Sequence, residues 1–251
     1  RLCLYKVVYG KYKADKAIAI ERFAMKILIA SDIHGSAYWT KQLMNALEKE
    51  QPHKVVLLGD ILYHGPRNNL PKGYNPKEVI PLLNSLAKTG NLIAVRGNCD
   101  AEVDQMVLDF PCMADFSQLI DDKGRTLFLT HGHIYGPGLH GSADNLPTLP
   151  NSSVVCYGHT HVKVNKPFYA GANREMLAYI NNGESKGVAK EVASEQSANN
   201  CEQIDKSKDA NLWLFNPGSL SLPKDGSHSY GIYDSELPIE EAFRHVVIGE
   251  C

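Results

Sequence analysis

No apolar run in this 251-residue sequence approaches the roughly 20 residues that a membrane-spanning helix needs, so we expect no membrane partner. The sequence also lacks a large charge of either sign, because its formal net charge is only −2. A general nucleic-acid binder is usually distinctly basic, so the charge indicates no specific nucleic-acid partner. The apolar content is ordinary for a globular chain, which at this length forms one sizeable core or at most two small domains.

Paired cysteine motifs are also absent. The six cysteines are scattered from Cys3 to Cys251, and none of them forms a C-x-x-C pair. This pattern argues against a disulfide framework and favours a reducing compartment, so we predict a cytoplasmic protein.

The chain begins at Arg1 rather than at a methionine, and residues 1–24 carry six basic and two acidic side chains. Their apolar stretches are too short for the core of a signal peptide. A strand-like run follows Met25 at once. We therefore expect residues 1–24 to be an N-terminal extension outside the core, and residues 25–251 to form one domain.

Short β-branched runs alternate with longer segments of helical spacing between Met25 and Tyr157. This alternation predicts an α/β fold with βαβ crossovers. The predicted strands are Ile27–Ala30, Val55–Leu58, Leu92–Val95, Thr126–Thr130 and Val154–Tyr157, followed later by Leu212–Phe215 and Tyr230–Tyr233. The predicted helices are Ser36–Glu50, Pro76–Lys88 and Ala101–Leu108.

The stretch from about residue 163 to 210 interrupts this pattern. Residues 183–209 are rich in Ser, Asn, Glu and Lys and include no aromatic residue. Such a composition buries too little apolar surface to offset the entropy of ordering. We expect a flexible insertion here, with a solvated helical flap as the alternative.

A potential metal ligand follows each of the first five predicted strands, at the edge where open α/β sheets build their sites. On an extended segment residues i and i+2 point the same way, so the D-x-H and H-x-H pairs should each converge. Carboxylate, imidazole and amide groups without thiolate suit Mn²⁺, Fe or Zn²⁺ with open positions. Seven ligands are more than one tetrahedral ion can bind, whereas two ions about 3.5–4 Å apart would use them all. The seven are Asp32, His34, Asp60, Asn98, His131, His159 and His161.

The order D-x-H, G-D, G-N, G-H and G-H-x-H resembles the calcineurin-like metallophosphoesterase superfamily. The similarity is closer to its bacterial YfcE-type phosphodiesterases, and it covers Met25 to about Val162 and about Leu212 to Val247. The stretches that carry it include His64–Asn68, Val95–Asp100 and Asn216–Ser219. The resemblance implies a single-domain αββα sandwich, in which two mixed β-sheets are flanked by helices.

The resemblance also implies a two-metal phosphodiesterase, in which a metal-bound hydroxide attacks phosphorus in line. Asp32, His34 and His161 would hold the first ion. Asn98, His131 and His159 would hold the second, with Asp60 as the bridge and with Asn98 and His131 as catalytic residues. Mn²⁺ is the favoured metal, and Ni²⁺, Fe, Zn²⁺ and Mg²⁺ are alternatives. The expected partner is a small phosphodiester, and a homo-oligomer remains compatible with the sequence.

The sequence departs from the superfamily at Cys99, where many members have a histidine. A neutral thiol is a weak hydrogen-bond donor, so it should stabilise a dianionic monoester less well than imidazolium. It should also crowd the second substituent of a diester less than a ring would. We therefore predict a preference for phosphodiesters and include Cys99 among the candidate catalytic residues. Asp100, which would otherwise orient that histidine, has no evident role.

Three further residues are candidate substrate contacts: His64, Arg67 and His133. Arginine binds phosphate bidentately, although His64 and Arg67 could instead fix their loop, and His133 could be a packed loop residue. Asn216–Ser219 is expected to be a structural turn beside the site. The alternative functions are a phosphomonoesterase of the same superfamily and a non-catalytic scaffold with this fold. A scaffold predicts degraded ligand positions, whereas every position here holds a competent residue.

Overall fold

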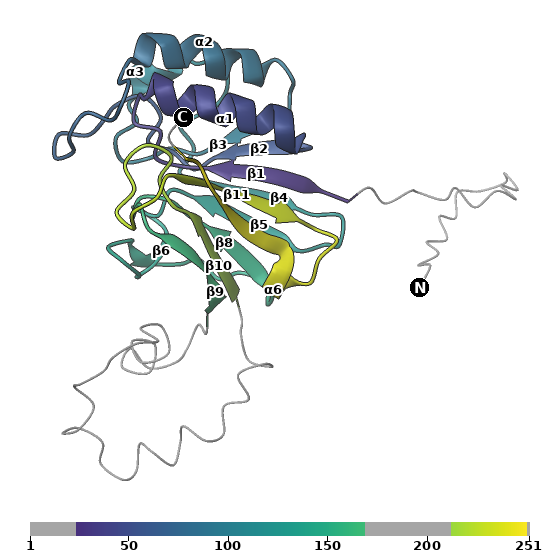
Figure 1. Ribbon diagram of the computed structural model, residues 1–251. Helices are drawn as coiled ribbons and strands as arrows, with labels where there is room; N and C mark the ends of the chain where they lie inside the picture. The colour runs from purple at the N-terminus through teal and green to yellow at the C-terminus, as the bar shows by residue number, and fades with distance from the viewer. Residues whose placement is uncertain (1–23, 169–211, 250–251) are drawn as a thin grey trace, which may run out of the picture.

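Two five-stranded β-sheets pack against each other in a computed structural model that describes residues 24–168 and 212–249 (Figure 1). The first sheet has the order β12-β11-β1-β2-β3 and the second β4-β5-β8-β10-β9. The strands of the first sheet are β1 (Lys26–Ala30), β2 (Lys54–Leu57), β3 (Leu92–Ala94), β11 (Ser229–Asp234) and β12 (Phe243–Val247). Those of the second are β4 (Phe116–Ile120), β5 (Thr126–Thr130), β8 (Ser153–Cys156), β9 (Lys163–Phe168) and β10 (Leu212–Pro217).

The described helices and a small ribbon complete the architecture. The two longer helices, α1 and α2, lie together on the outer side of the first sheet (Figure 1). The short strands β6 and β7 pair with each other outside both sheets. These elements are α1 (Ala37–Glu50), α2 (Pro76–Ala87), α3 (Glu102–Gln105), α6 (Ile239–Ala242), β6 (Gly136–Pro137) and β7 (Asp144–Asn145).

Both sheets are mixed. In the first, β1, β2 and β3 run parallel, while β11 and β12 are antiparallel additions. In the second, β5, β8 and β10 run parallel, and the edge strands β4 and β9 are antiparallel to their neighbours. The predicted sandwich of two mixed sheets with flanking helices is confirmed.

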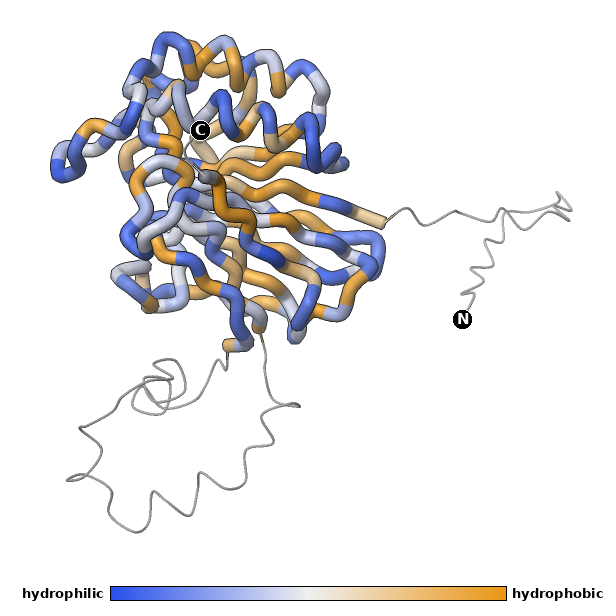
Figure 2. Tube along the Cα trace, in the orientation of Figure 1, coloured by the Kyte–Doolittle hydropathy of each residue, from blue (hydrophilic) through white to orange (hydrophobic). Residues whose placement is uncertain are grey.

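Strand β1 is buried on both faces, which is why its sequence is continuously apolar. Ile27 and Ile29 contribute to the core between the two sheets, while Leu28 and Ala30 pack under the helices. This division follows from the period-2 alternation of side chains along a strand. Figure 2 accordingly shows hydrophobic colour along the central strands and hydrophilic colour along much of the helices.

Helix α1 begins at Ala37 because Ser36, the predicted first residue, is its N-cap. The Ser36 hydroxyl accepts a hydrogen bond from the backbone N–H of Trp39 at 3.2 Å. Trp39, Leu43 and Leu47 recur every four residues and are buried, so one face of the helix packs on the sheet.

The predicted helix Ala101–Leu108 is wrong in length, because α3 covers only four residues. The Asp104 side chain accepts a hydrogen bond from the N–H of Ala101 and so caps the helix start. The Gln105 amide then donates to the carbonyls of Leu108 and Phe110, which turns the chain after the first helical turn.

The start of the expected insertion also needs correction. Residues 163–168 do not belong to it, because they form β9 and pair with β10 from Phe168↔Leu212 to Lys163↔Pro217. Val164 and Phe168 are buried in an apolar cluster of the second sheet that also contains Phe128 and Val155. Residues 169–210 and 1–23 lie outside the described residues.

No helix within residues 24–168 and 212–249 combines the length and the apolar character needed to cross a membrane.

A buried polar contact joins the two sheets at the end where β1 and β5 begin. The Tyr233 hydroxyl, on β11, donates to the carboxylate of Asp121 and accepts a hydrogen bond from Arg125 at 2.7 Å. The Asp121 side chain is fully buried and also accepts from the N–H groups of Lys123 and Arg125. Buried polar groups of this kind destabilise strongly when one partner is removed.

We expect Tyr233→Phe to lower the free energy of unfolding by about 1–3 kcal/mol, because Asp121 and Arg125 lose a buried partner. Urea denaturation measures this change. Tyr38→Phe is the matched control, since the buried hydroxyl of Tyr38 has no hydrogen-bond partner. Equal stability of the wild type and Tyr233→Phe would contradict the stabilising role of this hydrogen-bonded contact.

Candidate metal centre

The seven expected ligands follow the carboxyl ends of β1, β2, β3, β5 and β8, and the fold brings them together. Within each sheet these strands run parallel to one another, and the loops that follow them meet at one end of the sandwich. The connecting loops carry the side chains inward from there. Each loop contributes as follows: Asp32 and His34 after β1, Asp60 after β2, Asn98 after β3, His131 after β5, and His159 and His161 after β8.

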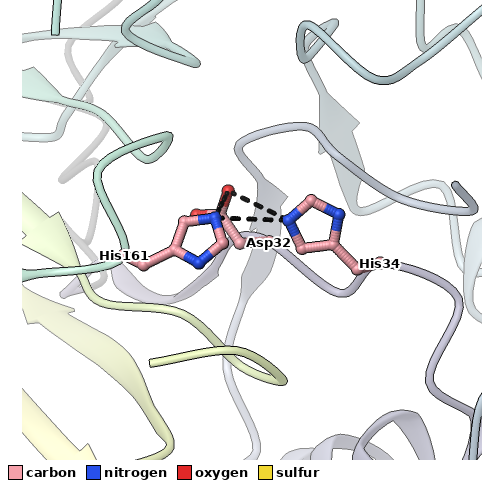
Figure 3. A group of neighbouring side chains, drawn as sticks. All are labelled: Asp32, His34 and His161. Carbon is pink, nitrogen blue, oxygen red and sulfur yellow. Dashed lines mark hydrogen bonds and ion pairs between the residues drawn. The ribbon is translucent and has the colours of Figure 1, made fainter. Parts of the chain in front are cut away.

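Asp32, His34 and His161 form one group (Figure 3). The Nε2 atom of His161 lies 3.3 Å from Oδ1 of Asp32 and 3.3 Å from Nε2 of His34. The Nε2 atom of His34 is 3.9 Å from the same carboxylate oxygen. Three potential ligand atoms thus converge on one small volume.

Asn98, His131 and His159 form a second group. The Oδ1 atom of Asn98 lies 3.1 Å from Nε2 of His131 and 2.6 Å from Nδ1 of His159. Asp60 faces both groups with different oxygens: Oδ1 is 3.4 Å from Nε2 of His131, and Oδ2 is 3.6 Å from Nε2 of His34. This position suits a carboxylate shared by two cations.

Three of the four imidazoles are oriented by backbone carbonyls. The Nδ1 atoms of His34, His131 and His161 lie 2.8, 2.6 and 2.6 Å from the carbonyl oxygens of Tyr63, Leu58 and Leu222 respectively. An Nδ1–H group that donates to a carbonyl leaves the Nε2 lone pair directed at the cluster, as in most metal-bound histidines. The Nε2 atoms of His34 and His161 face each other at 3.3 Å, so two lone pairs there would repel unless a proton or a metal ion lies between them.

The Asp32 carboxylate supplies the sharpest test of whether a metal fits. Asp32 is 0% exposed, and neither of its carboxylate oxygens accepts a hydrogen bond. Burial alone would raise the pKa of Asp32, but the attraction of His161 holds that pKa below its ordinary value. A buried, ionised carboxylate without donors is stable only beside positive charge, which divalent cations provide.

His131 shows the same need for positive charge. Burial lowers the pKa of this imidazole, but the negative charges of Asp60 and Asp32 outweigh burial and raise the pKa to about 9. Without metal, the group therefore keeps a proton that a bound cation replaces.

The backbone of the ligand loops differs from the extended form that we predicted. Five of the seven residues have positive φ: 57° at Asp32, 48° at His34, 54° at Asp60, 66° at His159 and 60° at His161. The expectation that i and i+2 converge through an extended segment is therefore wrong. A left-handed residue other than glycine costs about 1 kcal/mol or more, and such strain concentrates at functional sites.

Hydrogen bonds hold these strained residues in place. The N–H of His34 donates to the carbonyl of Asp60 at 2.8 Å. The carbonyl of Asp32 accepts from the hydroxyls of Ser219 and Ser221, each at 3.0 Å. The loop after β10 thus fixes the loop after β1.

The turn at Asn216–Ser219 also supports the histidine loop. The Asn216 amide donates to the carbonyl of Gly158 at 2.9 Å and to the hydroxyl of Thr160 at 3.0 Å. Its carbonyl oxygen accepts from the N–H of Gly218 at 2.9 Å. These contacts agree with the structural role that we predicted for this turn.

Asp100 has a positioning role that the sequence did not reveal. Its carboxylate accepts hydrogen bonds from the N–H groups of Asp60, Ile61 and Gly97 at 2.8, 2.7 and 2.7 Å. The loops after β2 and β3 are thereby tied together, so closely that a Cβ on Gly97 would overlap the Asp60 carboxylate. Burial raises the pKa of Asp100 to about 6, against the opposing effect of these donors.

The four other candidates lie in different places. Cys99 is half-buried, its Sγ atom is 3.2 Å from the amide nitrogen of Asn98, and it lines a cavity of about 170 Å³ beside the ligands. Arg67 lines the same cavity. The His64 ring packs against Tyr74 and does not line the cavity. The ring of His133 lies 5.3 Å from that of His131, and burial with the nearby imidazoles lowers the pKa of His133 to about 4.

Two cavity residues with basic side chains were missed in the sequence: Lys224 and His140. His140 lies between β6 and β7, where no motif marks it. Lys224 follows the Asn216–Ser219 turn by five positions, and this nearness to a motif is the one sequence signal that points to it.

We expect divalent metal to stabilise the wild type against heat and Asp32→Asn to lose most of this effect. A ligand at about 100 times its Kd adds about 2.7 kcal/mol to the free energy of unfolding. The measurement is the melting temperature of metal-stripped protein with and without added Mn²⁺. Asp109→Asn is the control, since Asp109 lies outside the cluster. A metal-induced shift of equal size in Asp32→Asn and wild type would refute the ligand role of Asp32.

Asp100→Asn should weaken Mn²⁺ binding by about 10–100-fold, because it disturbs the carboxylate that binds the backbone of the ligand loops. Asparagine keeps one acceptor oxygen but directs an NH₂ group at backbone N–H donors. Calorimetric titration with Mn²⁺ measures the loss, and Glu102→Gln, an exposed neighbour on α3, should bind as the wild type does. Unchanged Mn²⁺ affinity in Asp100→Asn would remove its positioning role.

Comparisons with known proteins point to the same family as these motifs. A family model described as the calcineurin-like phosphoesterase superfamily domain matches residues 25–199. Two relatives named Phosphodiesterase YfcE, from Escherichia coli strain K12 and from E. coli O157:H7, are 39% identical over 214 residues, or 85% of this chain and 89% of theirs. A solved structure of YfcE, described as a phosphoesterase from E. coli, is 37% identical over 90% of this chain and 100% of that chain, with a TM-score of 0.61. An archaeal phosphodiesterase at 22% identity and a TM-score of 0.50, matched over 89% of this chain and 100% of its own, shares the fold. The chain belongs to the calcineurin-like phosphoesterase superfamily.

Proposed function

We propose that this protein is a metal-dependent phosphodiesterase that hydrolyses small phosphodiesters. The observation that carries the proposal is the position of Asp60, whose two carboxylate oxygens face two separate groups of ligand atoms. The relatives named Phosphodiesterase YfcE support the same activity.

Two divalent ions fit this arrangement. Asp32, His34 and His161 would hold one ion, and Asn98, His131 and His159 the other, with Asp60 between them. The mixed oxygen and nitrogen donors favour Mn²⁺, with Ni²⁺, Fe, Zn²⁺ and Mg²⁺ as alternatives. When bound, such ions activate water as a nucleophile and neutralise charge on the phosphoryl oxygens.

The protein's own residues prepare the site for this chemistry. Burial keeps bulk water away from Asp32 and His131, so charges act there at short range and low dielectric. Asn98 lines the cavity, where it would orient a phosphoryl group, and the buried ring of His131 lies next to it, with Nε2 at 3.1 Å from the Asn98 carbonyl oxygen. His131 can also hold a proton at Nε2 when no metal is bound, because its pKa is raised to about 9.

Cys99 supports a preference for diesters. Burial, together with the negative charge of Asp60, raises the pKa of its thiol, so the group stays neutral. A neutral thiol supplies neither the charge nor the strong donor that a monoester dianion favours. The backbone N–H of Cys99 donates to Oδ1 of Asp60 at 2.8 Å, which fixes the thiol beside the cluster. A diester has one charge fewer and a second substituent that needs room.

The proposal includes a cytoplasmic location. Cys99, Cys112 and Cys156 are free thiols, which is compatible with a reducing compartment.

Metal-stripped protein should hydrolyse aryl phosphodiesters after addition of Mn²⁺, with a higher kcat/KM than for the matching aryl monoester. Asp60→Asn should lower diester kcat/KM by at least about 100-fold, beyond what an outer-shell change causes. The assay is a panel of both ester types with Mn²⁺, Mg²⁺, Ni²⁺ and Zn²⁺. An inactive wild type with every metal would overturn the enzyme assignment.

The same panel tests Cys99. Cys99→His should shift the ratio of monoester to diester kcat/KM towards monoesters, whereas Cys99→Ser, which stays small and neutral, should keep the wild-type ratio. A clear monoester preference in the wild type contradicts the proposed role of the thiol.

A further inference from the structure

The cavity beside the metal-ligand cluster extends past the ligands to a positively charged rim. The ligand residues Asn98, His159 and His161 line it, and so do the exposed residues Arg67 and Lys224, which form the rim. The cavity has a volume of about 170 Å³. Because the same cavity is lined by ligand residues and by both cations, a substrate whose phosphoryl group lies at the ligands has its remaining groups beside the rim.

The rim cations are not neutralised by their surroundings. Among the described residues, Asp60 is the only acidic side chain that lines the cavity, and it belongs to the ligand cluster. Asp225, the acidic neighbour of Lys224 in sequence, is already paired, because its Oδ1 lies 2.6 Å from Nζ of Lys163 and its Oδ2 accepts from the N–H of that lysine. Neither Arg67 nor Lys224 forms an ion pair with another described residue.

Both cations are attached to loops that the metal-ligand cluster fixes. The N–H of Lys224 donates to the carbonyl of His161 at 3.0 Å, while the ring of His161 contacts the carbonyl of Leu222. The loop that bears Lys224 therefore has a fixed position relative to one ligand.

Arg67 is positioned through Cys99. Gly65 has a φ of 80°, and a Cβ there would lie only 3.0 Å from the Cys99 Sγ atom. The Asn68 amide donates to the carbonyl of His64 at 2.9 Å and closes this turn. Arg67 and Lys224 thus line the same cavity from two different loops, one beside Cys99 and the other beside His161.

We propose that Arg67 and Lys224 form a second anion-binding subsite, and that the preferred substrate is a small phosphodiester whose second ester group carries a phosphate or a carboxylate. This inference rests on the proposed phosphodiesterase activity and names its substrate class. Arginine offers a planar fork of donors and lysine a mobile point charge, so the pair suits an anionic group of either type. The two cations bind the group that stays on the product, not the scissile phosphorus.

The test uses three p-nitrophenyl phosphodiesters that differ only in the second ester group: ethyl, 2-carboxyethyl and 2-(phosphonooxy)ethyl. With Mn²⁺-loaded wild type, we expect at least one of the two anionic diesters to exceed the ethyl diester in kcat/KM by about tenfold, or about 1.4 kcal/mol. In the double variant R67Q/K224Q this ratio should fall to about one, and in R67E/K224E the ethyl diester should be preferred. The carboxylate and phosphate substrates separate the two anion types.

The matched control is K77Q/K88Q, which removes the same amount of charge at two exposed lysines away from the cavity and should keep the wild-type ratio. Calorimetry gives a readout independent of turnover: ethylene glycol bisphosphate should bind wild type more tightly than ethyl phosphate, and R67Q/K224Q should bind both equally. Two results would overturn the subsite. In the first, R67Q/K224Q keeps the preference for anionic diesters. In the second, the wild type hydrolyses the ethyl diester but shows no such preference. Failure to hydrolyse any diester overturns the proposed function itself.

Discussion

The buried carboxylate of Asp32 lacks the hydrogen-bond donors that usually accompany a buried charge and is balanced by the imidazole of His161 at 3.3 Å, and this buried charge is the constraint on which the rest of the site depends. Asp60 and four imidazoles stand around or beside it, and five ligand residues adopt left-handed backbone. Each feature alone opposes folding, through desolvation or strain. The arrangement persists because neighbouring loops bind its backbone, above all through Asp100 and the two hydroxyls of Ser219 and Ser221. The stability of the surrounding fold therefore offsets the cost of this site.

The two ends of the sandwich have different roles. At the end where the parallel strands finish, glycines and strained residues leave space for ions and substrate. At the other end, Tyr233, Asp121 and Arg125 make a fully partnered polar contact between the sheets. The apolar core between them includes Ile29 and Leu129, both fully buried, so it connects the two ends rigidly. Loops that are anchored on rigid strands keep their side chains in a more precise geometry than unsupported loops would.

Much of the fold and of the candidate site was predictable from the sequence, because the signals lie in short, contiguous stretches of the chain. The apolar runs that end in Asp32, Asp60 and His131 predict buried strands and their carboxyl-end ligands at once. The left-handed backbone was not predictable, because Asp and His adopt it only when surrounding contacts impose it. The role of Asp100 also escaped notice, since its partners are backbone N–H groups, which no residue letter records. Lys224 was missed because only the folded chain brings it to the cavity. Strand β9 was missed because Lys163–Phe168 is largely polar in sequence and pairs with β10, which is distant in the chain.

The pairing of β9 with β10 has an evolutionary consequence. Phe168 and Leu212 are opposite each other in the ladder, although 43 residues separate them in the chain. The sheet itself brings these two points together, so residues can be gained or lost between them without a change of register in either strand. Because all seven candidate ligands precede Phe168, the sequence between the paired ends can diversify without a change in the candidate site. Related proteins should therefore differ in length at this position more readily than in the loops that bear the ligands.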